Sequence, residues 1–163
     1  MKKIFILFFI LFSVDVSSQE CSEFFLIRHA EKDRTNSENN NPKLNEIGKE
    51  RSLKWSEVFK NIELDKIYST NYYRTIETVT PVSKKFNLSI TLYSPSKINY
   101  KTFISENKGS KVLVVGHSNT IPGFVNSLIN QRVYDQIDDL NNSNLYIVKI
   151  CDNVVSHNLL YIK

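Results

Sequence analysis

The sequence predicts an α/β domain, a three-layer sandwich with a mostly parallel central sheet and helices on both faces. Apolar, β-branched runs of strand length alternate along the chain with amphipathic segments of helix length. This alternation is typical of βαβ units. The last two apolar runs, 144–150 and 154–162, flank the turn-forming pair Asp152-Asn153. They predict a C-terminal hairpin, and therefore an antiparallel edge on the sheet.

The predicted parallel strands are short apolar runs that end at polar or small residues. The run Phe24–Ile27 is followed by Arg28 and His29, and the run Val112–Val115 is followed by Gly116. Runs of this length that are rich in valine, isoleucine and aromatic residues are typical of buried strands. By the same criteria, strands are expected at 23–28, 65–70, 89–93 and 111–115.

The predicted helices lie between these strands, where apolar residues recur at intervals of three and four. The clearest is 46–60, in which Trp55 and Phe59 share one face. We expect Asn45 to cap the start of this helix and Gly48 to weaken its first turn. Further helices are expected at 72–86, 99–107 and about 120–130.

The chain is predicted to consist of a secretory signal peptide over residues 1–18 and one domain over 19–163. Two lysines precede the apolar run Ile4–Phe12, and small residues follow it. A membrane anchor is the alternative, but this run is too short to span a bilayer. A lipid anchor on Cys21 is a second alternative, although the preceding residues do not form a bacterial lipobox. We therefore expect an exported protein, periplasmic or extracellular, without stable membrane insertion after cleavage.

Charge and cysteine content narrow the class of protein further. The net charge is +4 and the chain has 163 residues. Because it contains no long basic run, the sequence does not predict a nucleic-acid binder. The two cysteines are Cys21 and Cys151. Export would permit a disulfide between them, and two free thiols are the alternative.

Two histidines follow predicted parallel strands. His29 has Arg28 beside it, and His117 comes directly after Gly116. Because the carboxyl ends of parallel strands meet at one edge of a sheet, the two histidines are expected to share a crevice. Imidazole is a nucleophile at neutral pH, and arginine binds phosphate bidentately. A histidine packed in the core is the alternative for each, but the pattern favours a phosphate site.

Arg74 is a second arginine placed to reach the same edge. It lies four residues after the predicted strand 65–70, in the first turn of the next helix. A solvated helix arginine is the alternative. The N-termini of the helices that begin near 72 and 120 would add N–H donors for an anion. We expect Ser118 and Asn119 to cap the second of these helices rather than to contact a substrate.

Several motifs in this order resemble the histidine phosphatase superfamily, which has the phosphoglycerate mutase-like fold. They are Leu26–Glu31, then Tyr68–Thr70 with Arg74–Thr78, and then Val115–Ser118. The segment Leu44–Gly48 is also similar to that family's helix start. The resemblance covers most of the chain after the signal peptide, and the short length is similar to that of its compact phosphohistidine phosphatases.

The resemblance implies a metal-independent phosphoric monoester hydrolase, similar to histidine acid phosphatases, that works through a covalent phosphohistidine. His29 would be the nucleophile, and Arg28 and Arg74 would hold the phosphate. His117 would also bind the phosphate and would stabilise the transferring group. The substrate would be a phosphorylated small molecule or a phosphoprotein. Neither a metal nor an organic cofactor is implied, and no zinc-type spacing such as His-x-x-x-His occurs.

A catalytic acid is the one part that the motifs do not supply. Many members of the family have a glutamate after the third strand, whereas 92–97 contains no carboxylate. Glu77 is the first candidate for this acid and Glu31 is the second. The compact phosphohistidine phosphatases are similar in lacking the acid, because a phosphorylated imidazole needs protonation less than an alkoxide does. A non-catalytic module that binds phosphate or phosphoproteins is the alternative function on the same fold.

Overall fold

A computed structural model describes residues 20–152 and 154–163. The predicted signal peptide over residues 1–18 lies outside these residues. The strands are β1 (Cys21–Arg28), β2 (Lys66–Thr70), β3 (Ile90–Tyr93), β4 (Lys111–Gly116), β5 (Asn144–Cys151) and β6 (Val154–Tyr161). The helices are α1 (Glu46–Val58), α2 (Tyr73–Phe86), α3 (Tyr100–Glu106) and α4 (Ile121–Ile129). Within the described ranges, no helix has the length and apolar character needed to cross a membrane.

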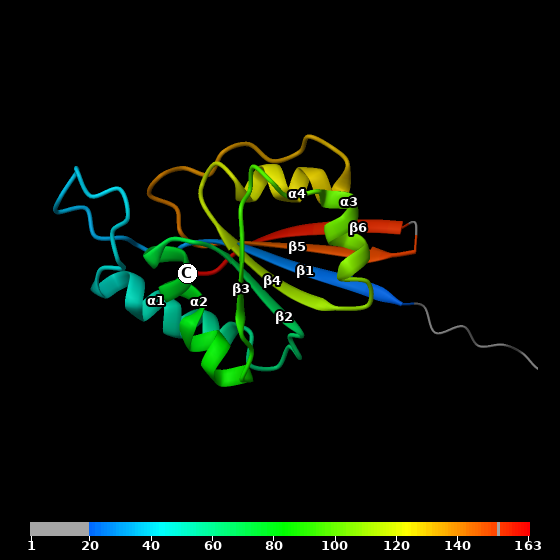
Figure 1. The fold of residues 1–163 in the computed structure, drawn as a ribbon, viewed down its shortest axis with the longest axis horizontal. Coiled ribbons are helices and arrows are strands. Elements are labelled where there is room, and N and C mark those ends of the chain that lie inside the picture. Colours follow the sequence, from blue (N-terminus) through cyan, green and yellow to red (C-terminus); the bar gives the residue numbers. More distant parts are fainter. Residues whose placement is uncertain (1–19, 153) are drawn as a thin grey trace, which may run out of the picture.

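The strands form one sheet in the order β3-β2-β4-β1-β5-β6. The pairs β1–β4, β2–β4 and β2–β3 are parallel, whereas β5 runs antiparallel to β1 and β6 antiparallel to β5. Figure 1 shows α1 and α2 on one side of this sheet and α3 and α4 on the other. The predicted three-layer fold with an antiparallel C-terminal edge is confirmed.

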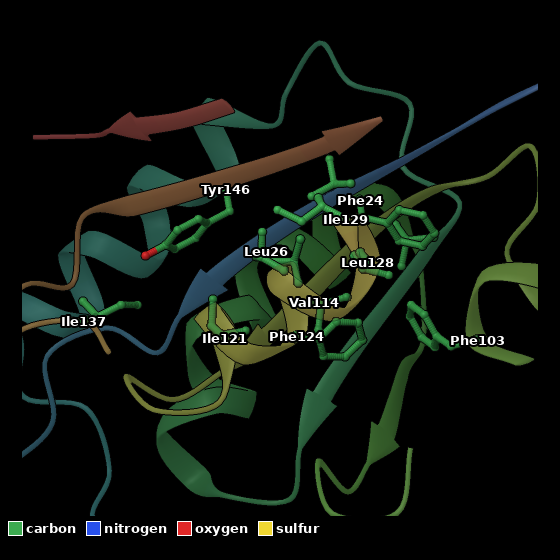
Figure 2. Packing of buried hydrophobic residues seen from close by; sticks show 13 residues of the cluster. Phe24, Leu26, Phe103, Val114, Ile121, Phe124, Leu128, Ile129, Ile137 and Tyr146 are labelled. Atoms are coloured by element: carbon green, nitrogen blue, oxygen red, sulfur yellow. The ribbon is translucent and has the colours of Figure 1, made fainter. Parts of the chain in front are cut away.

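The core consists of two apolar clusters, one on each face of the sheet. Successive strand residues point to opposite faces, so Phe24 and Leu26 join the cluster under α3 and α4 (Figure 2), while Phe25 and Ile27 join the cluster under α1 and α2. All four side chains are buried. Burial on both faces explains why β1 reads as a continuous apolar run rather than an alternating one.

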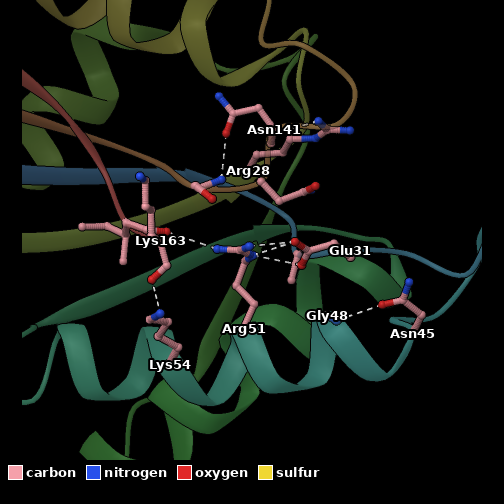
Figure 3. A network of polar contacts seen from close by, with 12 residues as sticks. Arg28, Glu31, Asn45, Gly48, Arg51, Lys54, Asn141 and Lys163 are labelled. Carbon is pink, nitrogen blue, oxygen red and sulfur yellow. Dashed lines mark hydrogen bonds and ion pairs between the residues drawn. The ribbon is translucent and has the colours of Figure 1, made fainter.

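The start of α1 is fixed by a side-chain cap and by a close backbone contact. The Oδ1 atom of Asn45 accepts a hydrogen bond from the backbone N–H of Gly48 at 2.8 Å (Figure 3), so the predicted cap is confirmed. A Cβ atom at Gly48 would lie only 2.1 Å from the backbone oxygen of Glu31. The sequence suggested that Gly48 is a weak point of α1. It is not, because only glycine allows α1 to pack against the segment that follows β1.

We expect Gly48→Ala to lower the free energy of unfolding by about 2 kcal/mol or more, because a backbone oxygen cannot move aside as a side chain can. Gly123→Ala in α4 is the matched control, since a Cβ there would meet no atom within 4 Å. That control should be neutral or stabilising by about 0.5–1 kcal/mol. Urea denaturation of both variants measures the difference. Equal stabilities would contradict the packing argument.

A disulfide joins the two cysteines, which resolves the alternatives that the sequence left open. Cys21 at the start of β1 lies directly opposite Cys151 at the end of β5 in the antiparallel register. The bond closes a sequence separation of 130 residues. It therefore connects the N-terminal end of the central strand to the C-terminal hairpin, at the opposite end of β1 from Arg28.

Candidate functional site

The candidate site lies beyond the carboxyl ends of β1, β2 and β4. The loop after β1 and the long segment between α4 and β5 extend from this end of the sheet (Figure 1). A cavity of about 320 Å³ opens here with an almost entirely polar lining. Its lining residues are Arg28, His29, Lys32, Arg74, His117, Ser118, Asn119, Gln136 and Asp139. The structure thus brings together the two histidines and two arginines that the sequence singled out.

His29 is fixed in one orientation by its hydrogen bonds. Its Nδ1 atom lies 2.7 Å from the carbonyl oxygen of Ala30, and because a carbonyl only accepts, Nδ1 must carry the proton. Its backbone N–H donates to Gly116 O at 2.9 Å, and its backbone oxygen accepts from Asn142 Nδ2 at 2.7 Å. No described residue hydrogen-bonds Nε2. The lone pair of Nε2 is therefore the available nucleophile of this ring.

His117 lies beside His29, with their ring centroids 5.5 Å apart. The Nη2 group of Arg74 lies 3.4 Å from Nδ1 of His117 and can only donate to it. Nδ1 is then the acceptor, and Nε2 carries the proton that it donates to the hydroxyl of Thr70 at 3.0 Å. Thr70 in turn donates to the hydroxyl of Thr75 at 3.1 Å. This chain of hydrogen bonds holds the second ring in its neutral form.

Arg28 is almost completely buried, with 2% of its surface exposed. Its Nη1 group donates to the backbone oxygens of Asp138 at 2.8 Å and Asn141 at 3.0 Å. Its Nη2 group donates to Oδ1 of Asp139 at 2.7 Å. The second oxygen of Asp139 pairs with Arg34 at 2.8 Å. The segment between α4 and β5 therefore orients the first arginine of the pocket and also supplies it with a counter-charge.

Arg74 lies in the first turn of α2, and its guanidinium stacks over the ring of Tyr72 at 4.4 Å. The Nε atoms of Arg28 and Arg74 are buried and find no hydrogen-bond partner among the described residues. Buried donors without partners are rare because each costs free energy. Two of them on the two arginines of one pocket fit a site that receives an oxyanion.

The structure brings neither candidate acid into the pocket. Oε2 of Glu77 accepts a hydrogen bond from the backbone N–H of Leu44 at 2.8 Å and so supports the loop after β1. Glu31 is paired with Arg51, whose Nη2 lies 2.8 Å from Oε1 (Figure 3). Both carboxylates stabilise the surroundings of the pocket and line neither of its cavities.

A wider cavity of about 600 Å³ adjoins the first and shares Arg74, His117 and Asn119 with it. Two tyrosines, several hydroxyl and amide groups and one proline line the remainder. The further lining residues are Thr70, Asn71, Tyr72, Tyr93, Ser94, Pro95, Ser96 and Thr120. Arg74 is the one charged residue of this lining, so the cavity suits a neutral or aromatic group.

Burial and the surrounding cations keep both histidines neutral. Burial lowers the pKa of His29 to about 3, an effect opposed by the hydrogen bond to Ala30 and strengthened by the charge of Arg28. Burial, with the charges of Arg74 and Arg28, lowers the pKa of His117 to about 4. At neutral pH the Nε2 lone pair of His29 is therefore free of a proton, as a nucleophile requires.

These pKa values predict how activity would respond to acid if His29 is a nucleophile. A nucleophilic histidine with an ordinary pKa would lose activity below about pH 6.5, whereas we expect kcat/KM to persist to about pH 4 and to fall below it. The folded state also binds fewer protons than the unfolded chain between these pH values, so its stability should decrease as the pH falls through this range. A pH profile of kcat/KM, with melting temperatures at each pH, measures both. A fall of kcat/KM near pH 6.5 would contradict the lowered pKa values of the two histidines.

Several pocket residues were not recognised from the sequence. Lys32 and Gln136 come from the two loops, and Asp139 lies in a segment without regular structure, where no motif marked it. Ser118 and Asn119 line the pocket, whereas Thr120 holds the N-cap position of α4. The expected capping role of Ser118 and Asn119 is wrong, because Thr120 directly precedes α4 and occupies the N-cap position. Among the described residues, no cluster of histidine, cysteine or acidic side chains could hold a metal ion.

Comparisons with known proteins agree with this arrangement. The model of the histidine phosphatase superfamily (branch 1) matches residues 24–94, which include Arg28, His29 and Arg74. The protein histidine phosphatase SixA, solved with tungstate, superposes with a TM-score of 0.67 at 16% identity, over 85% of this chain and 96% of that one. The SixA protein of Agrobacterium tumefaciens superposes with a TM-score of 0.62 at 18% identity, over 85% of this chain and 97% of that one.

A phosphoglycerate mutase from Bacillus anthracis also shares the fold, with a TM-score of 0.65 at 15% identity, over 87% of this chain and 93% of that one. No curated protein matches the chain by sequence. The class defined by the fold and the site is an α/β protein with two histidines and two arginines at one edge of the sheet. The family model over residues 24–94 confirms the resemblance to the histidine phosphatase superfamily, and the matched structures share the fold of this chain.

Proposed function

We propose that this chain is a phosphatase that hydrolyses phosphomonoesters or phosphohistidine through a covalent phosphohistidine on His29. The observation that carries this proposal is the state of the His29 ring. Its Nδ1–H is bound to a backbone carbonyl, its Nε2 is free, and the pocket around it contains His117 and the guanidinium groups of Arg28 and Arg74. The matched structure of a protein histidine phosphatase supports the same class of reaction.

In the first step, the Nε2 lone pair of His29 attacks phosphorus, and the bond from phosphorus to the leaving group breaks. The leaving group keeps the electron pair of that bond. Arg28 and Arg74 hold the phosphoryl oxygens, and the Nε2–H of His117 is redirected from Thr70 to one of them as negative charge develops. In the second step, water attacks phosphorus and the P–N bond returns its electrons to His29. The proton of the attacking water passes to a phosphoryl oxygen, and inorganic phosphate leaves.

The proton needed by the leaving group limits the range of substrates. Asp139 is the only carboxylate that lines the phosphate cavity in the described part of the chain. Hydrogen bonds from Arg34 and Arg28 lower its pKa to about 2, so it does not donate at neutral pH. This favours leaving groups that depart without a strong acid, such as the imidazole of phosphohistidine or a phenol. The wide cavity beside Tyr72 and Tyr93 has the size and chemistry to receive them.

The lack of a proton donor also keeps a second function open. A phosphate- or phosphoprotein-binding module would need the same arginines but neither a free nucleophile nor an acid. The two functions differ in turnover, since a module would bind oxyanions without hydrolysing any ester or phosphoramidate. The free Nε2 of His29 favours the enzyme.

We also propose that the protein is exported after cleavage of residues 1–18, as the sequence predicts. The disulfide between Cys21 and Cys151 supports this localisation, because disulfides persist in oxidising compartments such as the periplasm. Fractionation of expressing cells, with mass measurement of the processed chain, tests both cleavage and location. An unprocessed chain in the cytosol would contradict the proposal.

The decisive experiment for the activity is a hydrolysis assay in the presence of a metal chelator, on the chain from Gln19. The substrates are para-nitrophenyl phosphate and phosphoramidate, and rapid quenching traps the intermediate. We expect turnover of both, a preference for phosphoramidate, and an acid-labile, base-stable phosphoryl group on the protein. Binding of inorganic phosphate without turnover of either substrate would instead establish the binding module.

A further inference from the structure

We propose that the carboxylate of Asp139 is a counter-anion built into the pocket, which competes with the substrate's phosphoryl group for Arg28. By doing so it weakens the binding of phosphorylated substrates and speeds the release of product phosphate. This inference rests on the proposed phosphate site and adds to it a residue that neither the sequence motifs nor the comparisons assign. It is tested by equilibrium binding, which does not require turnover.

The contacts of Arg28 show which of its donors the carboxylate takes. Both N–H groups of Nη1 go to the backbone oxygens of Asp138 and Asn141. The Nη2 group donates to Asp139 at 2.7 Å, and Nε has no partner among the described residues. Because Nε is buried and Nη1 is occupied, an entering oxyanion can reach Arg28 at Nη2, and there it meets the carboxylate of Asp139.

Asp139 is not needed to orient Arg28. Two backbone carbonyls already hold the guanidinium, and the chain carrying them is fixed by further hydrogen bonds, such as the one from Asn142 Nδ2 to His29 O at 2.7 Å. A purely structural role would be satisfied by these contacts. The carboxylate adds a negative charge to the lining of a pocket that contains His29 and His117.

Arg34 provides the carboxylate with a second partner on the solvent side. Its Nη1 group lies 2.8 Å from Oδ2 of Asp139, and its side chain is half exposed. When a phosphoryl group takes Nη2 of Arg28, the carboxylate keeps its ion pair with Arg34. Displacement from Arg28 therefore does not leave the carboxylate without a partner. When phosphate binds, it replaces the Asp139 carboxylate at Nη2 of Arg28, and when phosphate leaves, the carboxylate returns.

The expected consequence is that phosphate binds more weakly and dissociates more rapidly. Arg28, Lys32 and Arg74 all line the cavity, and three cations without a counter-charge would retain the product. One nearby negative charge offsets part of this attraction, and its removal is expected to tighten oxyanion binding about tenfold. The same change should lower KM for a phosphorylated substrate without raising kcat.

The test compares inorganic phosphate binding to the native chain and to Asp139→Asn by calorimetry at fixed ionic strength. Asp135→Asn is the matched control, because it removes the same charge from the same segment. Asp135 is exposed and lines neither cavity. We expect Kd for phosphate to fall about tenfold in Asp139→Asn and to change less than about twofold in the control.

Product inhibition of para-nitrophenyl phosphate hydrolysis provides the second readout, and the inhibition constant of phosphate should fall by the same factor as Kd. Unchanged phosphate binding in Asp139→Asn would overturn the proposal, and weaker binding would show that Asp139 positions Arg28 instead. Either result would leave the phosphatase proposal standing if the native chain turns over. Tighter binding in Asp139→Asn without turnover in any variant would support the counter-anion and overturn the phosphatase.

Discussion

Replacement of His29 by alanine should lower the turnover of para-nitrophenyl phosphate and phosphoramidate by about 10³-fold or more. The reason is that Nε2 of His29 is the proposed attacking atom. Although His117 lies nearby, its Nε2 atom carries the proton donated to Thr70, and its Nδ1 accepts from Arg74. The variant should also fail to form the acid-labile phosphoryl-enzyme. Steady-state rates and quenched-flow trapping measure the two effects.

The same variant should keep its fold. The ring of His29 makes one side-chain hydrogen bond, to the adjacent Ala30 carbonyl, so the melting temperature should stay within about 3 °C of the native value. His157→Ala is the control, because this third histidine lies on β6 and hydrogen-bonds Tyr134 at 2.8 Å, away from the pocket. It should retain full turnover. Activity that survives in His29→Ala, or a large loss of its stability, would contradict the proposed role.

Loss of the disulfide should be the largest effect on stability. Cys21→Ser and Cys151→Ser each remove the same bond, which closes a separation of 130 residues. Each variant should lose about 3 kcal/mol of unfolding free energy, since an open chain gains more conformational freedom on unfolding than a cross-linked one. The double variant should be no less stable than either single variant, because the two changes break one shared interaction.

Reduction of the native chain supplies the matched comparison for these variants. A reducing agent should lower the native melting temperature to that of Cys21→Ser and should leave that variant unchanged. Activity below the transition should persist, because Cys21 lies about 20 Å along β1 from Arg28. Additive losses in the double variant, or a native melting temperature that does not respond to reduction, would contradict the prediction.

Much of the fold could be predicted because its signals are local. The continuous apolar run of β1 indicates burial on both faces, and the stripe containing Trp55 and Phe59 places α1 against the sheet. The hairpin of β5 and β6 follows from two apolar strands around a turn-forming pair. Gly48 shows the limit of this approach, because its role depends on the backbone of Glu31, which lies in the segment that follows β1.

Part of the candidate site was equally accessible from the sequence. Arg28, His29, Arg74 and His117 all follow strands whose carboxyl ends meet at one edge, so strand position alone predicts that they converge. The sequence made Glu77 the first candidate for the catalytic acid, because no carboxylate follows the third predicted strand. The structure instead places its carboxylate at the backbone N–H of Leu44, in support of the loop.

The sequence by itself determined the strands and helices, the layered and mostly parallel sheet, and the two histidines and two arginines at its edge. It could do so because strand and helix periodicity are properties of neighbouring residues. Only the tertiary structure decided the pairing of Cys21 with Cys151 and the entry of Asp139 into the pocket. Asp139 is 111 residues from Arg28 and lies in an irregular segment. Its contact depends on how that segment closes over the strand ends, and no local pattern records such a closure.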